Sequence, residues 1–194
     1  LSTIDSFYDQ LDDPAKTPPR KMDIETALTA IDRIKKKSQA LDEERASLQA
    51  EHGSMVDSLK IIRPFRNLDY DVSSILKFRY IHYRFGRIEK QYLQKFEKYI
   101  YDNLDTLFIK CGEDEQYTYG VYFVPEHEAH KVHAVYSSMH FERIFIPDNY
   151  EGTAAQAFEK LDRHHKEIHR KLDANKAAAQ KLLTDNQEDI VSAK

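Results

Sequence analysis

Residues 76–83 read LKFRYIHY, an aromatic and β-branched run that is typical of a β-strand. The sequence RFGR follows at 84–87, and its glycine, Gly86, predicts a turn. From 88 to 102, apolar side chains recur three and four residues apart among charged ones, which predicts a helix with one buried stripe. This stretch is therefore expected to form a strand, a turn and a helix.

Four more elements are predicted before residue 147. Two strands are expected at 106–111 and 117–124, and the polar segment between them is short enough for a hairpin loop. A helix is expected over 126–138 and a last strand over 139–146, which Pro147 ends. The predicted order is β-α-β-β-α-β. It indicates an α+β fold with a ferredoxin-like antiparallel sheet and both helices on one face.

Long charged segments with helical periodicity flank this region. The outgoing segment has Asp23 as a candidate N-cap and a seam position that is apolar every seven residues, at Ile34, Leu41, Leu48, Met55 and Ile62. The second seam position of this segment holds both apolar and polar residues, among them His52. The return segment has a seam with two polar interruptions, His165 and Asn175. We expect these segments to form a long antiparallel, coiled-coil-like pair of helices, because both connect to the same compact region. The predicted domains are a short helix and loop (1–20), an outgoing stem helix (21–62), an α/β lobe (63–149) and a return stem helix (150–194).

Composition restricts the function classes. The 194 residues include 29 Lys and Arg against 33 Asp and Glu, a net charge of -4, and 32% of them are charged. Much of the chain is therefore expected to be solvent-exposed helix. The single cysteine, Cys111, excludes an intramolecular disulfide and fits a reducing compartment. No apolar run approaches the roughly 20 residues that a membrane-spanning helix needs, so we expect a soluble chain.

No motif for catalysis or for cofactor binding emerges. The five glycines are scattered, so neither a P-loop nor a dinucleotide-binding fingerprint is present. Histidines recur at metal-ligand spacing at 127, 130 and 133 and at 165 and 169, but no cysteine or carboxylate at matching spacing completes a ligand set. We therefore expect no catalytic residue, no cofactor and no metal site.

Short motifs occur in a consistent order along the chain: RFGRI at 84–88, FIKC at 108–111, GVYFVP at 120–125 and HFER at 140–143. With Gly152 beyond them, they resemble the cytoplasmic N-terminal domain of subunit I, also called subunit a, of V-type ATPases and A/V-type ATP synthases. The structural residues that this resemblance implies are Arg84, Phe85, Gly86, Arg87, Gly120, Pro125, Phe141, Glu142 and Gly152.

The resemblance implies a non-catalytic stator element, the distal lobe of the subunit that carries the ion channel. Such a lobe would attach the channel to the peripheral-stalk heterodimer of E/G-type subunits and resist rotor torque during proton or sodium transport. The membrane domain of the same subunit would then be a further partner, absent from this chain. The chain begins at Leu1 rather than at a methionine, so we expect a fragment from the cytoplasmic face of the membrane. Its stem could form a non-physiological dimer.

Four residues are candidates for contact with a partner, because a simple strand register would let them project from one sheet face. They are Arg79, Lys110, Tyr122 and Arg143. Alternate residues of strand 117–124 point to opposite faces of the sheet, and both faces receive bulky side chains. The second sheet face is therefore also expected to be covered. Two interpretations stay open for that face: coverage by the stem or by segment 65–72, or coverage by a partner.

Two other functions remain as alternatives. An RNA-recognition domain shares the β-α-β-β-α-β order and stacks bases on aromatic side chains of its first and third strands. The aromatic residues available here are Tyr80, Tyr117, Tyr119, Tyr122 and Phe123. The negative net charge argues against phosphate binding, so we expect no nucleic-acid partner. The second alternative is a free-standing coiled-coil adaptor.

Overall fold

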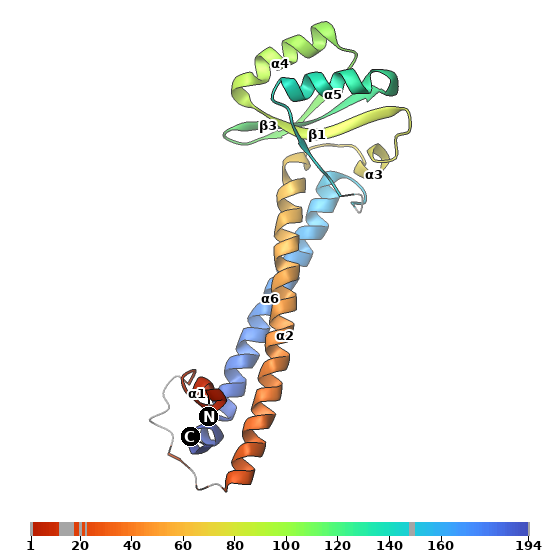
Figure 1. The fold of residues 1–194 in the computed structure, drawn as a ribbon. Coiled ribbons are helices and arrows are strands. Elements are labelled where there is room, and N and C mark those ends of the chain that lie inside the picture. The colour runs from red at the N-terminus through yellow and green to blue at the C-terminus, as the bar shows by residue number, and fades with distance from the viewer. Residues whose placement is uncertain (1, 12–17, 20, 22, 148–149, 194) are drawn as a thin grey trace. The chain divides into compact units, whose positions relative to one another are not determined.

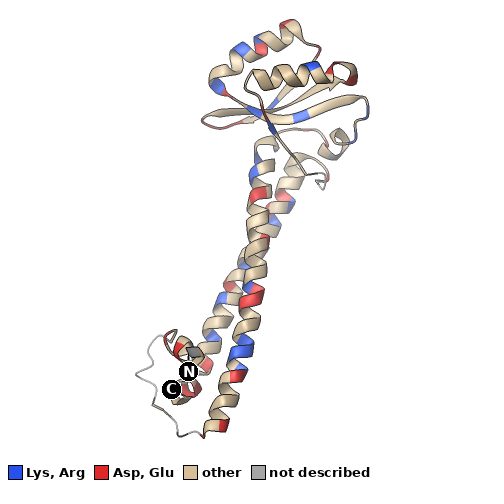
Figure 2. Cartoon of the chain, viewed as in Figure 1, with Lys and Arg blue, Asp and Glu red and all other residues tan. Residues whose placement is uncertain are grey.

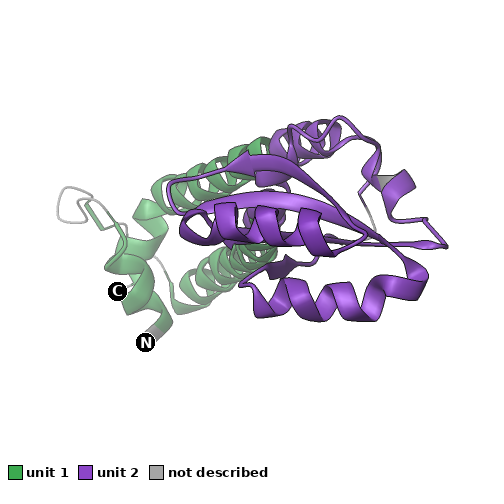
Figure 3. Cartoon of the chain, turned by 90° about the horizontal axis from the view of Figure 1, so that it is seen from above, with its two compact units in different colours: residues 1–54, 165–194 green, residues 55–164 purple. Residues whose placement is uncertain are grey.

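The computed structural model describes residues 2–11, 18–19, 21, 23–147 and 150–193 (Figure 1). It divides into two compact units, shown in Figure 3. We call residues 1–54 and 165–194 the helical unit, and residues 55–164 the sheet unit. The described helices are α1 (Ser2–Tyr8), α2 (Ile24–Ile62), α3 (Val72–Ile75), α4 (Lys90–Asn103), α5 (Ala129–Ser138), α6 (Ala154–Asp185) and α7 (Gln187–Ala193), with short 3-10 helices η2 (Arg63–Phe65) and η3 (Glu126–Glu128). The described strands are β1 (Ile81–Glu89), β2 (Leu107–Glu113), β3 (Tyr117–Pro125) and β4 (Glu142–Ile144).

The sheet unit is built on a four-stranded antiparallel sheet with the spatial order β2-β3-β1-β4. The mixed α+β class that the sequence predicts is confirmed. Helices α4 and α5 lie on the same face of this sheet (Figure 1). Their amphipathic faces bury an aromatic core around Phe96, Phe108 and Tyr136, in which the Phe96 and Tyr136 rings meet edge to face at 5.0 Å.

The opposite sheet face is covered by the chain itself. Phe65, Leu68 and Val72, which follow α2, pack against Phe85 and Val121 of the two central strands. The Phe65 and Phe85 rings meet edge to face with their centroids 5.2 Å apart. Of the two interpretations left open for this face, coverage by segment 65–72 is therefore confirmed. A covered face offers no open platform on which RNA bases could stack.

The first strand lies further along the chain than the sequence predicts. Residues 76–83 were expected to form it, with a turn at Gly86, but β1 begins at Ile81 and runs through Gly86 to Glu89. The reason is close packing: a Cβ at Gly86 would overlap the Phe141 ring and the Glu142 carbonyl oxygen of the neighbouring segment. The glycine therefore allows a close backbone approach inside a strand rather than a turn.

The other elements follow their predicted ranges with smaller changes. The hairpin between β2 and β3 turns at Asp114, whose Oδ1 accepts hydrogen bonds from the amides of Gln116 at 2.9 Å and Tyr117 at 2.7 Å. Strand β4 keeps only three of the eight residues predicted for it, and it begins after His140, which takes a positive φ of 68°. Gly152, with a φ of 76°, lies just before α6, where its missing side chain permits this backbone conformation.

The predicted long helix is α2, which ends at Ile62 before Pro64, and its residues up to 54 belong to the helical unit. Asp23 is its N-cap as predicted, because the Thr26 amide donates to Asp23 Oδ1 at 2.9 Å. Near this end, Phe7 of α1, Ile31 and Ile34 of α2 and Ile190 of α7 form a small buried core. The domain boundaries given above stay a prediction. Among the described helices, none combines the length and the apolar character that crossing a membrane requires.

Polar seam residues of α2 and α6 pair with one another inside the helical unit. Asn175 is 4% exposed, and its Nδ2 donates to the Leu41 carbonyl at 3.0 Å and to Glu44 Oε2 at 2.8 Å. The Nε2 atoms of His52 and His165 lie 3.1 Å apart. A buried polar residue that bonds specific positions of a neighbouring helix favours one register of the two helices at a cost in stability. Asn175 favours one register through its bonds to Leu41 and Glu44, and the cost comes from its Oδ1, which is buried with no hydrogen-bond partner among the described residues.

We expect opposite stability changes from two substitutions at Asn175. Asn175→Leu removes the unpartnered oxygen and adds apolar contact, so it should raise the free energy of unfolding by about 1 kcal/mol. Asn175→Asp places a second carboxylate beside that of Glu44 and should lower it by about 2 kcal/mol. Thermal unfolding followed by circular dichroism measures both. Equal unfolding midpoints for the two variants would contradict this account of the seam.

Candidate partner-binding site

The four predicted contact residues do not form one surface. Lys110 lies on edge strand β2, where its Nζ is 2.9 Å from Glu97 Oε1 of α4. Arg143 lies on β4, the opposite edge of the sheet. Arg79 lies in the bend before β1, outside the sheet. Only Tyr122 and Arg143 come together, and the role of all four in binding stays a prediction.

Tyr122 lies under the helices rather than on an open face. It is 1% exposed, its ring centroid is 3.8 Å from that of Tyr136 on α5, and its hydroxyl is 2.7 Å from His133 Nδ1. The strand register places Lys110, Tyr122 and Arg143 on this same sheet face, the one that the helices cover. Alternation along β3 places Tyr122 and Val124 on the face that α4 and α5 cover, and Val121 on the other.

Around the Tyr122 hydroxyl the structure gathers a group that we call the basic cluster: His82, Arg84, His133 and Arg143. Arg84 is the cross-strand neighbour of Tyr122 on β1, and its guanidinium acts electrostatically on Tyr122, His133 and Arg143. The His82 and His133 rings lie 6.0 Å apart. His82 and Arg84 lie on β1, and Arg143 lies on β4, which pairs with β1. His133 lies on α5.

The environment fixes the charges of this cluster. Burial raises the pKa of Tyr122 to about 12, although the Arg84 charge opposes that shift. Burial, and then the positive charges of Arg84, His82 and Arg143, lower the pKa of His133 to about 4. Burial and the Arg84 charge also lower the pKa of Arg143. At neutral pH Arg84 and Arg143 are therefore charged, whereas the His133 imidazole and the Tyr122 phenol beside them are neutral.

The two arginines have no carboxylate partner within the described part of the chain. Other cations of the same sheet do have one: Arg87 Nε lies 2.7 Å from Glu142 Oε2, and Lys110 pairs with Glu97. Like charges held together without a counter-charge cost stability, and such arrangements are typical of functional sites. Figure 2 shows that cationic and anionic residues are interspersed along α2 and α6.

An exposed aromatic residue completes the surface. Phe145 is 68% exposed, and the Arg143 guanidinium carbon lies 4.0 Å from the centroid of its ring. Arginine and aromatic side chains dominate the binding energy of protein interfaces, and a guanidinium binds a carboxylate or a phosphate through paired hydrogen bonds. Arg84, Arg143 and Phe145 therefore form a surface suited to an anionic partner group. Sequence reasoning found Arg143 but missed Arg84 and His133 as members of this cluster.

We expect the pKa of His133 to report on this cluster. In an NMR titration His133 should titrate near 4, far below the ordinary 6.5 of histidine, and Arg84→Gln should raise that pKa by removing one positive charge. Between these two pH values the unfolded chain binds a proton that the folded chain does not, so stability falls as the pH drops from 6.5 towards 4. His133→Gln should reduce this slope. A pKa of His133 near 6.5 would contradict the assignment.

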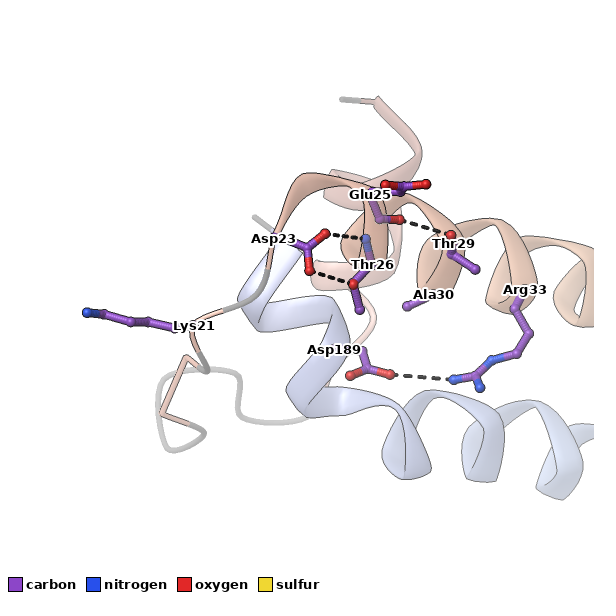
Figure 4. A pocket seen from close by; sticks show the side chains of 8 residues that line it. All are labelled: Lys21, Asp23, Glu25, Thr26, Thr29, Ala30, Arg33 and Asp189. Atoms are coloured by element: carbon purple, nitrogen blue, oxygen red, sulfur yellow. Dashed lines mark hydrogen bonds and ion pairs between the residues drawn. The ribbon is translucent and has the colours of Figure 1, made fainter.

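A hollow in the helical unit has a structural explanation. Figure 4 shows that its lining includes Asp23, Thr26, Arg33 and Asp189. Asp23 caps α2 by accepting from the amide and the hydroxyl of Thr26, and this lowers the pKa of Asp23. Arg33 pairs with Asp189 of α7 at 3.5 Å. These groups already satisfy one another, so they stabilise the ends of the helices.

Comparison with known proteins finds matches among solved structures. No family model matches the sequence, and no curated protein matches it. Among solved structures, a crystal structure of the cytoplasmic N-terminal domain of subunit I, homolog of subunit a, of V-ATPase matches with a TM-score of 0.63 and 13% sequence identity. The match covers 99% of this chain and 64% of that domain, so this chain spans less than two thirds of it. At this identity the match shows a shared fold.

Proposed function

We propose that this chain is a non-catalytic stator element, the distal lobe of the cytoplasmic domain of a rotary V-type ATPase or ATP synthase subunit I. The observation that carries the proposal is the fold shared with a subunit I cytoplasmic domain over 99% of this chain. In this role the chain lies at the cytoplasmic face of the membrane and anchors the membrane domain of the same subunit against rotor torque. Ion translocation then belongs to that membrane domain.

We also assign the sheet unit to the ferredoxin-like arrangement. The order β-α-β-β-α-β along the chain supports it, as do the central positions of β1 and β3 and the edge positions of β2 and β4. Both helices lie on one face of the sheet in that arrangement, as α4 and α5 do here. The opposite face, packed by Phe65 and its neighbours, is closed to a further partner.

The contact that we assign to this lobe is with the peripheral-stalk heterodimer of E/G-type subunits, through the basic cluster. Arg84 and Arg143 offer two positive charges with no carboxylate partner in the described part of the chain, and Phe145 offers exposed aromatic surface beside them. A stalk segment that carries Asp or Glu would complete this surface. Guanidinium–carboxylate pairing would give the contact orientation as well as affinity.

The test is a calorimetric titration of the chain with the peripheral-stalk heterodimer from the same source, beside single-stranded RNA, at physiological salt. Saturable binding of the heterodimer at one site per chain, and none of RNA, is the expected result. Binding of RNA alone, with a steep dependence on salt, would overturn the stator proposal in favour of a nucleic-acid module.

A further inference from the structure

Three histidines meet between the two long helices of the helical unit. His52 lies on α2, and His165 and His169 lie on α6, four residues apart and therefore on one face of that helix. The Nε2 atoms of His52 and His165 are 3.1 Å apart, and the ring centroids of His52 and His169 are 6.2 Å apart. The interior seam of two packed helices is normally apolar, as Ile168 beside them is, at 1% exposed.

We propose that these three imidazoles bind a divalent transition-metal cation such as Zn²⁺, which bridges α2 and α6. Zinc binds imidazole nitrogens at about 2.0–2.1 Å in tetrahedral geometry, so two such ligands lie roughly 3.3 Å apart. The 3.1 Å between the Nε2 atoms of His52 and His165 is close to that separation. These two nitrogens approach each other from opposite helices, and both rings would turn so that their lone pairs converge on a cation beside the line between them.

His169 supplies the third ligand after a change of rotamer. As the side chains stand, the described residues contain no set of three His, Cys, Asp or Glu side chains arranged to hold a metal. His169 is exposed and one helical turn from His165, so its ring can turn towards the pair between staggered side-chain conformations. A water molecule can fill the fourth position, because His52 and His165 are only half-buried.

The metal site accounts for more than a structural histidine pair does. A neutral His–His hydrogen bond uses one N–H donor and one nitrogen acceptor, and it gives no role to His169. A cation uses all three rings and links helices that belong to distant parts of the sequence. The site lies in the helical unit, apart from the basic cluster, and does not depend on the stator proposal.

A metal titration of the whole chain, after treatment with a chelator, tests the site. We expect one Co²⁺ per chain, with the intense visible absorption of tetrahedral cobalt, and its displacement by Zn²⁺. His52→Ala, His165→Ala and His169→Ala should each weaken Zn²⁺ binding by roughly 100-fold or more. The matched control is His127→Ala, which removes an exposed histidine of the sheet unit and should leave the affinity unchanged.

Two outcomes would overturn the proposal. One is a wild-type chain that takes up no Co²⁺ or Zn²⁺ with saturation. The other is an unchanged affinity for Zn²⁺ in His169→Ala. Because His169 is exposed, this substitution should not disturb folding. Circular dichroism of each variant separates a lost ligand from a lost fold, and loss of binding in His127→Ala would assign the metal to the sheet unit instead.

Discussion

Gly86→Ala should lower the free energy of unfolding by about 3 kcal/mol or more, the largest stability effect that we expect from a single added methyl group. The new Cβ would overlap the Phe141 ring and the carbonyl oxygen of Glu142, and the second of these is backbone that cannot turn aside. Relief would require β4 to move away from β1, which would break the pairing of Arg87 with Glu142. Chemical denaturation followed by tyrosine fluorescence measures the change.

Gly53→Ala is the matched control, because it adds the same methyl group where space is open. No atom of the surrounding structure lies within 4 Å of a Cβ at Gly53. Since glycine inside a helix costs about 1 kcal/mol relative to alanine, this variant should be more stable than the natural chain. If the two substitutions changed stability in the same direction, the packing described between β1 and β4 would be wrong.

The second large effect concerns binding. Arg84→Glu combined with Arg143→Glu should weaken binding of the peripheral-stalk heterodimer by roughly 100-fold or more, because it replaces two attractive charge pairs by repulsive ones. The affinity of the natural chain should also fall as salt is raised, since the contact is electrostatic. Titration calorimetry at two salt concentrations measures both effects.

A double charge reversal elsewhere on the sheet unit controls for net charge. Lys95→Glu with Lys98→Glu changes the total charge by the same amount, on exposed positions of α4. This variant should bind within a few-fold of the natural chain. Equal losses in the two double variants would mean that total charge, and not the basic cluster, governs binding.

Periodicity was sufficient to predict α2, α4, α5 and α6 and most of the sheet, but not the short helices α3 and α7. The regular spacing from Ile34 to Ile62 and the cap at Asp23 are local features, so the sequence specifies α2 directly. The position of β1 could not be predicted in the same way. Gly86 reads as a turn in the sequence, and only the approach of Phe141, 55 residues later, shows why a strand needs a glycine there.

The basic cluster is harder to predict because it depends on strand register. Tyr122 and Arg143 were chosen because a simple register would place them on one sheet face, and the sequence did not show that α4 and α5 pack on that face. Arg84 lies opposite Tyr122 only because β1 is shifted along the chain from its predicted position. In the structure Gly86 lies opposite Gly120, and this register brings Arg84 beside Tyr122. Nothing in the sequence favoured this register over the others.

The fold and the site support the proposed function in different ways. The shared fold, with a TM-score of 0.63, relates the whole chain to a subunit I cytoplasmic domain. It does not depend on any side chain. The basic cluster, by contrast, rests on Arg84, Arg143 and Phe145 of this chain alone. The titrations above can therefore refute the contact without refuting the fold assignment.

The most direct test of the stator proposal is site-specific cross-linking in the assembled membrane complex. A photoreactive phenylalanine derivative at position 145 would stand on the exposed side of Arg143, and one at Tyr101 of α4, which is 55% exposed, would serve for comparison. We predict a cross-link from position 145 to a peripheral-stalk subunit and none from position 101. A stalk adduct from position 101 alone, or no stalk adduct from either, would contradict the proposed contact.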